Sequence, residues 1–415
     1  MVLPNALKLH PVIQAHPGHH QGFTPLTLTN AVTYLLLVAL CWAALLSLCM
    51  GAWRAIQSGG SQDFQYSIAR LILHGVNPYA DWLKGDKSHF LLNQDPLYLP
   101  NLSYLLSPFA VLDWPTAKCL WMVVNLTLAC YAAWLLYAAY NRQGKTNCGL
   151  LIALLFLSSN PVRVAIGNGQ QALLILVATV WALRHRSSPL LSGMAFSVSL
   201  AKYSIGPFFL AAELGCRRII AILVVVAIVL AAFVGLSIQT HSPFNLSLLL
   251  GPLEVSKLYP SFSNHFLWLN QHFGFSGIRL LSLIGLAVVC LRARALASAG
   301  LPAKEVDMKL ACGATFASLL FAPHLGYDFL MLALPLALGC RLDQLKKLER
   351  CLYIAVLLFW WNIGSFLSAL RLPVVITTGA TVLMILAFVL LVYAFLAKAS
   401  NQINTAEDNV IQSAL

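Results

Sequence analysis

Charged residues are scarce in this sequence. Lys, Arg, Asp and Glu make up 10% of its 415 residues, whereas 59% are hydrophobic and the mean hydropathy is +0.78. An ordinary soluble domain carries roughly a quarter charged residues, with which it covers its surface. The scarcity therefore excludes a soluble globular protein, and we expect an integral membrane protein that uses lipid as its solvent.

Acidic residues are rarer than basic ones, 14 against 26, which gives a formal net charge of +12. The basic residues lie in short clusters between apolar runs, a pattern typical of cytoplasmic loops under the positive-inside rule. We therefore expect membrane lipids, and no nucleic acid, as partners. The clusters are Arg142 with Lys145, Arg184 with Arg186, Arg217 with Arg218, Arg292 with Arg294, and Arg341 with Lys346, Lys347 and Arg350.

Three further absences narrow the class of protein. The ten cysteines include no C-x-x-C pair, which gives no support to a zinc or redox site. There is no internal repeat. The first apolar run begins near Asn30 after a polar lead with no signal-peptide cleavage pattern. We expect a cytoplasmic tail over 1–29, a membrane domain over 30–398 and a polar cytoplasmic tail over 399–415.

The apolar runs predict an all-α polytopic bundle of about ten to twelve transmembrane helices. Two pairs of short runs meet at polar residues, one at Lys202 and the other at Pro323-His324. Such breaks are tolerated only where they face protein or water. The runs cover roughly 31–52, 116–139, 148–162, 171–184, 189–201, 203–215, 219–238, 277–291, 308–322, 326–340, 351–370 and 373–397.

If the N-terminus is cytoplasmic and every run crosses, all five basic clusters fall inside, as the positive-inside rule requires. The long segments 53–115 and 239–276 then face outward. Within the first, Ser61 to Gly75 reads as an amphipathic helix that Asn77-Pro78-Tyr79 ends. Asn101 to Val111 reads as a second short helix along the membrane surface.

Asp63 follows the first crossing at the outer face. A carboxylate there is half-desolvated, which raises its basicity and suits a general base that acts on a hydroxyl. The alternative is a helix N-cap, because aspartate is a good cap before an amphipathic run. The residue types and their spacing leave both roles open.

The order of motifs resembles glycosyltransferase family 87, which contains bacterial polyprenyl-phosphate-mannose-dependent mannosyltransferases of the GT-C superfamily. The resemblance covers roughly residues 60 to 340. Its motifs are Asp63-Phe64 with Tyr66 and Asn77-Pro78-Tyr79, then Tyr98 and Pro100, Ser107-Pro108-Phe109, Ala117 with Trp121 and Asn125, Gly167-Asn168-Gly169-Gln170, Leu200-Ala201-Lys202, Asn264-His265-Phe266-Leu267, and Ala322-Pro323-His324 with Asp328. Tyr203 and His265 depart from the proline and glutamine of the family pattern.

The resemblance implies a GT-C-like fold with its active site on the non-cytoplasmic face and Asp63 as the base. Lys202, Arg163 and His324 are the expected donor-phosphate ligands. Each has an ordinary alternative: Lys202 can pair with a carboxylate or extend to the surface, and Arg163 can anchor a helix end. His324 follows a proline at a tight turn.

Six further residues are expected to contact the sugar or the acceptor, although ordinary hydrogen bonding within loops explains them as well. They are Tyr66, Asn77, Tyr79, Tyr98, Gln170 and Asn264. No metal ligand is expected among the site residues. No cofactor is expected either, and a requirement for a divalent cation stays open because Asp63 has no acidic neighbour in the sequence.

The expected function is transfer of a hexose, expected to be mannose, from a polyprenyl-phosphate donor to a lipid-linked or cell-envelope glycan. The expected location is the cell inner or plasma membrane, with the site facing the periplasm or exterior. The main alternative is a secondary transporter or lipid-linked glycan flippase, which would bind substrate near the midplane through broken helices. A noncatalytic membrane scaffold is a third reading.

Overall fold

The apolar runs form helices in the computed structural model, and the residues that it describes contain no β-strand. These residues are 28–91, 94–142, 144–257, 264–359, 361 and 374–397, without the side chains of 28–30, 257, 264–278, 344, 374–381 and 397. Most of the predicted tails, 1–29 and 399–415, lies outside them. The all-α fold class is confirmed.

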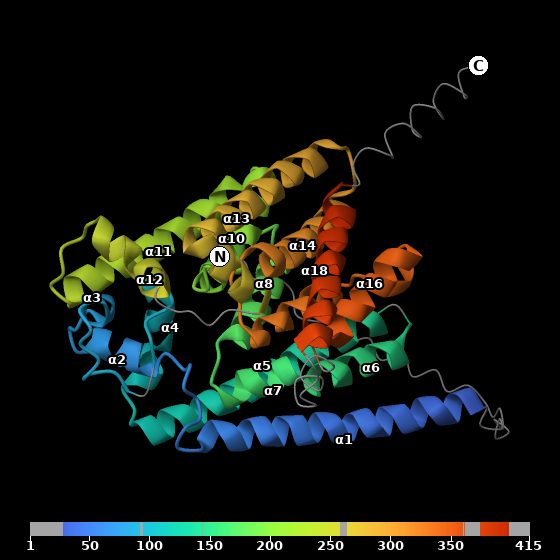
Figure 1. Ribbon diagram of the computed structural model, residues 1–415, viewed down its shortest axis with the longest axis horizontal. Coiled ribbons are helices and arrows are strands. Elements are labelled where there is room, and N and C mark those ends of the chain that lie inside the picture. The colour runs from blue at the N-terminus through green and yellow to red at the C-terminus, as the bar shows by residue number, and fades with distance from the viewer. Residues whose placement is uncertain are drawn as a thin grey trace, which may run out of the picture.

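The first half of the chain holds two long helices and a set of short ones (Figure 1). They are α1 (Leu28–Ile56), α2 (Tyr66–Leu73), α3 (Pro78–Leu83), α4 (Pro100–Ala110), α5 (Trp114–Asn141), α6 (Thr146–Leu157), α7 (Asn160–Gly167), α8 (Ala172–Arg184), α9 (Pro189–Leu200) and α10 (Gly206–Gly215).

Among the described residues, the second half adds three helices of more than 20 residues and several shorter elements. Its elements are α11 (Ile219–Gln239), α12 (Leu246–Lys257), α13 (Asn264–Ser298), α14 (Ala303–Phe321), the 3-10 helix η1 (Gly326–Ala333), α15 (Leu334–Ala337), the 3-10 turn η2 (Leu342–Gln344), α16 (Lys347–Leu358) and α18 (Val374–Ala397).

Four helices in the described part of the chain are long and apolar enough to cross a membrane, in α1, α5, α11 and α13. The run predicted over 148–162 forms the pair α6 and α7, bent by 46°, which would make a fifth crossing. Large apolar side chains of α1 such as Leu35 (71% exposed) and Trp42 (62% exposed) face outward, as expected in lipid. A polytopic membrane protein is confirmed, whereas ten to twelve crossings stays a prediction.

Basic residues from four of the five clusters gather at one end of the bundle, which we call the basic end (142, 144–146, 184–188, 213–218, 298–307 and 337–347). Lys145 pairs with Asp343 at 2.5 Å. Arg186 and Arg218 both pair with Asp307, at 2.7 and 2.8 Å. Buried Glu213 also accepts from Arg186, and Arg184 donates to the Ala337 carbonyl at 2.6 Å. Segments that the topology predicted on one membrane face therefore lie together.

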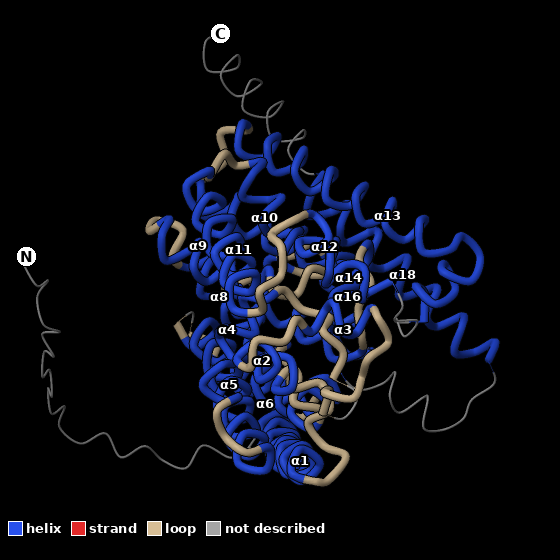
Figure 2. Tube along the Cα trace, turned by 90° about the vertical axis from the view of Figure 1, so that its left-hand side faces the viewer, coloured by secondary structure: helices blue, strands red, loops and turns tan. Residues whose placement is uncertain are grey.

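Several other described connections meet at the opposite, loop end (57–91, 94–115, 168–171, 201–205, 239–257 and 322–328), where α2, α3, α4 and α12 cluster in Figure 1. The Leu99 amide donates to the Ala201 carbonyl at 3.3 Å, and Asn77 donates to Ser242 at 3.0 Å. Figure 2 shows the loops winding among these short helices. The two breaks predicted around residues 202 and 323 are confirmed, and both lie at this end.

The two short helices predicted at this end are present. The second is α4, close to its predicted bounds. The first, α2, begins at Tyr66, five residues later than predicted, because the amides of Ser61 and Asp63 donate to the carbonyls of Gly167 and Asn168 at 3.0 and 2.9 Å. Residues 61–65 are thereby bound to α7 and cannot continue the helix.

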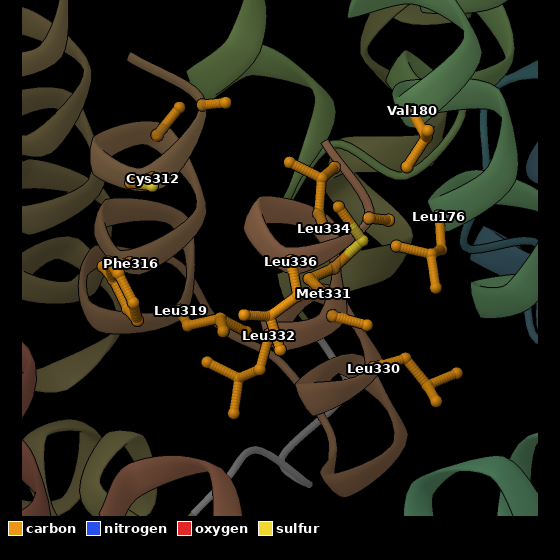
Figure 3. Packing of buried hydrophobic residues seen from close by; sticks show 14 of the residues in the cluster. Leu176, Val180, Cys312, Phe316, Leu319, Leu330, Met331, Leu332, Leu334 and Leu336 are labelled. Carbon is orange, nitrogen blue, oxygen red and sulfur yellow. The ribbon is translucent and has the colours of Figure 1, made fainter. Parts of the chain in front are cut away.

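The core lies around η1 and α15, which are buried between α8 and α14. Figure 3 shows Leu330, Met331, Leu332, Leu334 and Leu336 of this segment between Leu176 and Val180 on one side and Phe316 and Leu319 on the other. All are buried. A 3-10 segment survives here because its carbonyls find partners: Tyr353 donates to Leu332 at 2.6 Å and Trp361 to Phe329 at 3.0 Å. The core thus fixes the turn at 322–328.

Candidate active site

The connection after α1 turns sharply at Gly60 and presents Asp63 at the loop end. Gly60 has no room for a side chain, since a Cβ would lie 1.9 Å from the Arg54 carbonyl oxygen. Gln171 also donates to the Asp63 carbonyl at 3.1 Å. The backbone at Asp63 is therefore held by α7 and by the start of α8, which is what a catalytic side chain needs.

An aromatic cluster fixes the residue next to Asp63. The Phe64 ring stacks on Trp121 with centroids 4.9 Å apart and planes 5° apart, and it meets Phe109 edge to face at 5.8 Å. Trp121 in turn donates from its indole nitrogen to the Gly169 carbonyl at 2.8 Å. Such aromatic pairs contribute about 0.5–1.5 kcal/mol each beyond area burial. The cluster therefore joins the loop, α4, α5 and the 168–170 turn into one rigid support.

The Asp63 side chain lies in a niche of about 20 Å³, room for about one water molecule. Gln170, Tyr98 and Tyr327 line it. Burial raises the pKa of Asp63 above its usual range, while hydrogen bonds from Gln170 and Asn168 and the charge of Lys202 lower it. The N-cap alternative is excluded, because the cap of α2 is Gln65 and no side chain caps that helix.

A larger cavity of about 370 Å³ adjoins the niche. Leu97, Tyr98, Leu325 and Tyr327 line both spaces, so they share a wall. Most of the larger cavity is apolar, with Lys202 and Arg279 as its cationic residues. Leu283 of α13 also lines it and is 62% exposed, so the cavity reaches the surface that faces lipid.

Lys202 is buried and forms an ion pair with Asp328. Its ammonium also lies 4.6 Å from the centre of the Tyr327 ring. The other oxygen of Asp328 accepts from the Leu325 amide at 3.0 Å, so the turn at 325–328 holds the carboxylate in place. The structure thus brings Lys202 to the cavity beside Asp63, with its charge already partly neutralised.

His324 lines the same cavity but is suited to accept rather than to donate. Its Nδ1 lies 3.0 Å from the Ala322 carbonyl oxygen, which can only accept, so Nδ1 carries the proton. Burial lowers the pKa of His324 to about 4, which keeps the ring neutral and leaves Nε2 unprotonated. The expectation that His324 donates to a phosphate is therefore not supported by this geometry.

Tyr98 and Gln170 are brought together beside Asp63. The Tyr98 hydroxyl donates to Oε1 of Gln170 at 3.1 Å, and both side chains are buried. The oxygen of Gln170 is thus occupied by Tyr98, and its amide nitrogen donates to the Asp63 carboxylate. These two of the six predicted sugar contacts therefore lie beside Asp63, the predicted base.

Three other predicted contacts do not line either cavity. The Tyr66 hydroxyl donates to the Leu112 carbonyl at 2.7 Å. Asn77 caps α3 by accepting from the amides of Tyr79 and Ala80, both at 3.2 Å. The Tyr79 hydroxyl donates to the Tyr98 carbonyl at 2.7 Å. These side chains hold the loop together, and their contact with a substrate stays a prediction.

Arg163 was assigned to the donor phosphate, and the structure places it elsewhere. It lines a separate cavity of about 760 Å³ between α1 and α7, together with Arg54. Asn264 begins α13, but its side chain lies outside the described residues. Of the three predicted phosphate ligands, Lys202 alone is positioned as a cation beside the Asp63 niche.

Sequence reasoning missed Arg279 and Asn168. A signal for Arg279 was present, because a charge inside an apolar run is expensive and marks function by default. Asn168 stood in a recognised motif, but its side chain was given no role. Among the described residues, one group could hold a metal ion, Asp81 with Asp86 and His89. It lines neither cavity, and metal dependence stays untested.

The model of glycosyltransferase family 87 matches residues 97–323, more than half of the chain. The protein belongs to glycosyltransferase family 87. The matched segment contains Tyr98, Gln170, Lys202 and Arg279, and it begins after Asp63. Searches of curated proteins and of solved structures returned no match.

Membership in family 87 makes the chain a membrane glycosyltransferase, which acts on a sugar donor and an acceptor. The apolar helices that surround its cavities agree with such a role in a bilayer. The geometry of Asp63 is an observation independent of the family match, because Asp63 lies outside the matched residues.

Proposed function

We propose that this glycosyltransferase transfers a hexose from a polyprenyl-phosphate donor to a lipid-linked or envelope glycan, and that the hexose is mannose. One observation carries the proposal: a half-buried carboxylate, Asp63, lies in a niche whose wall is shared with an apolar, cation-bearing cavity. The niche suits the acceptor hydroxyl, and the cavity suits a phosphate with its hydrocarbon chain.

Asp63 acts as the general base in this proposal. It takes the proton from the acceptor hydroxyl, whose oxygen attacks the anomeric carbon. The bond between that carbon and the phosphate oxygen breaks, and the polyprenyl phosphate leaves with the electron pair. Attack opposite to the leaving group inverts the anomeric centre. The raised pKa of Asp63 makes the carboxylate a stronger base than an exposed one.

Lys202 and Arg279 stabilise the charge that develops on the leaving phosphate. Both line the cavity, from the 201–205 break and from α13. The ion pair with Asp328 holds the Lys202 ammonium at the cavity before the donor arrives. A fixed cation needs no reorganisation during the reaction, which is where electrostatic catalysis gains its effect.

The loop end faces the periplasm or exterior in this proposal, because the basic clusters lie together at the other end. The transporter alternative requires a midplane site reached from both sides. The cavity here is lined by residues of the loop end and of the adjoining turns of α13, which does not favour transport.

The test is transfer by the purified protein in detergent. Polyprenyl-phosphate mannose and polyprenyl-phosphate glucose, each radiolabelled in the sugar, are supplied with an envelope lipid extract. We expect a labelled product from at least one donor with the wild-type protein and none with Asp63→Asn. Transfer from a nucleotide sugar, with none from either lipid donor, would refute the proposal.

A further inference from the structure

Two arginines face a cavity that the proposed reaction does not use. Arg54 ends α1, Arg163 lies in the first turn of α7, and both line the space of about 760 Å³ between these helices. The cavity, called here the arginine cavity, lies on the other side of α7 from the core. Its apolar edge is formed by Met50 and Trp53, which are 55% and 66% exposed.

Neither arginine has an acidic partner among the residues that the structure describes. Nε of Arg54 donates to Oδ1 of Asn168 at 3.2 Å, and Arg163 donates to Oδ1 of Asn160 at 2.6 Å. Both partners are neutral amides, so two positive charges stay uncompensated at the border of the apolar surface. Elsewhere in the protein, Arg186, Arg218 and Lys202 are each paired with a carboxylate.

Helix electrostatics explain one of these charges but not the other. A cation in the last turn of a helix, where Arg54 lies, is favoured by the helix dipole. Arg163 lies in the first turn of α7, where the same dipole disfavours a cation and favours an anion. A bound anion between the two arginines would remove that conflict.

The backbone is shaped to bring Arg54 against α7. Gly167 has no side chain, and a Cβ there would lie 2.9 Å from Cδ of Arg54. Arg54 therefore lies across the end of α7, beside Asn168 and on the same side as Arg163. Two guanidinium groups so arranged suit phosphate, because each offers paired donors in a plane.

The surroundings indicate a lipid as the source of that phosphate. Met50 and Trp53 continue the exposed apolar face of α1, which includes Leu45 and Leu46. A phosphate on the arginines would therefore have its hydrocarbon chains directed along a surface that already faces lipid. Tryptophan near the end of a membrane-crossing helix, where Trp53 lies, is typical of the membrane interface.

Asn168 connects the arginine cavity to the base. Its side-chain oxygen accepts from Arg54, its carbonyl accepts from the Asp63 amide at 2.9 Å, and its amide hydrogen-bonds the Asp63 carboxylate. A single residue thus contacts the cation of one cavity and the base of the other. A lipid whose phosphate is bound by Arg54 would have its head group next to Asp63.

We propose that the arginine cavity binds the phosphate of a membrane lipid and that this lipid is the acceptor of the sugar. The second part rests on the proposed function. The donor and acceptor phosphates would then be held in different cavities, one by Lys202 and Arg279 and the other by Arg54 and Arg163. Asp63 is linked to the second of these cavities through Asn168, which lines it, and in this proposal the acceptor hydroxyl alone has to reach the base.

Binding is tested without any sugar donor. Native mass spectrometry of the full-length protein in detergent would measure the affinity for short-chain phosphatidylglycerol, with Arg54→Gln, Arg163→Gln and the conservative Arg163→Lys. Each glutamine variant should bind at least about tenfold more weakly, because it loses the charge and the paired donors that hold a phosphate. Arg163→Lys should retain part of the affinity. Thermal unfolding of each variant checks that it is folded.

Arg142→Gln is the matched control, because it removes one exposed arginine at the basic end and should leave binding unchanged. Equal affinity of wild type and both glutamine variants would overturn the site, as would an equal loss in the control. Inorganic phosphate that competes as strongly as the lipid at equal concentration would overturn a lipid as the ligand.

Kinetics then separates the acceptor from the donor. With the envelope extract as acceptor, Arg54→Gln and Arg163→Gln should raise the extract concentration for half-maximal rate at least several-fold and leave KM for the lipid donor unchanged. A rise in donor KM alone would overturn the acceptor assignment. If the wild type transfers nothing from polyprenyl-phosphate sugars, the proposed function fails, whereas the binding result is unaffected.

Discussion

Lys202 and Asp328, 126 residues apart in the sequence, form a buried ion pair at the edge of the cavity that adjoins the Asp63 niche. Removing one partner of a buried pair leaves an uncompensated charge and typically destabilises a protein by about 3–5 kcal/mol. Lys202→Met should therefore lower the melting temperature, measured by thermal unfolding in detergent. Asp328→Asn should do the same.

The double variant Lys202→Met with Asp328→Leu separates stability from function. Neither charge is then left alone, so most of the lost stability should return. If Lys202 binds the donor phosphate, the double variant should still show a KM for the donor raised at least tenfold. Recovery of both stability and donor KM would mean that Lys202 serves the fold alone.

Replacement of Asp63 by asparagine tests the base. The change keeps the size of the side chain and one acceptor oxygen but removes the carboxylate that takes up the proton, so transfer should fall at least about a hundredfold. Asp113→Asn is the matched control. Asp113 is a helix N-cap, accepting from the Thr116 amide at 3.4 Å, and asparagine caps nearly as well. Near-normal turnover by Asp63→Asn would refute its role.

The pH dependence of transfer follows from the surroundings of Asp63. Burial raises its pKa, and a base must be deprotonated to act, so activity should decline as the pH falls through a value above the usual aspartate range. Gln170 lowers this pKa by hydrogen bonding. Gln170→Leu should therefore move the acidic limb of kcat/KM to higher pH. An unmoved limb would show that Asp63 does not set it.

The orientation of the bundle is tested by cysteine labelling in a background without reactive native cysteines. Ser88 lies at the loop end and Thr146 at the basic end, and both are exposed. With a membrane-impermeant reagent, Ser88→Cys should label from outside the cell, and Thr146→Cys only after the membrane is opened. The reverse pattern would place the Asp63 niche on the cytoplasmic face.

The helices and their breaks could be predicted from the sequence because apolar runs and their interruptions are local properties. Ser61 and Asp63 show where it fails: their amides bind carbonyls of α7, and that long-range pairing delays α2 to Tyr66. Local spacing carries no information about such a partner.

Site residues were harder to predict than the fold. A motif contains both the residues that meet a substrate and those that hold them, and Tyr79 and Tyr98 illustrate the difference. Tyr79 donates to the Tyr98 carbonyl, whereas the Tyr98 side chain faces the niche. The cavity that Arg163 lines could not be predicted for another reason. Cavities lie on different sides of α7, and spacing along a single helix does not show which one a side chain meets.

Leu283 makes the cavity that contains Lys202 continuous with the surface of α13 that faces lipid. A donor that arrives there diffuses within a two-dimensional film, and the spent polyprenyl phosphate departs by the same route. The quantity that sets occupancy is then its mole fraction among the surrounding lipids rather than its concentration in bulk solution. We therefore expect the turnover rate to fall when inert lipid dilutes a fixed amount of donor, even though the number of enzyme and donor molecules is unchanged.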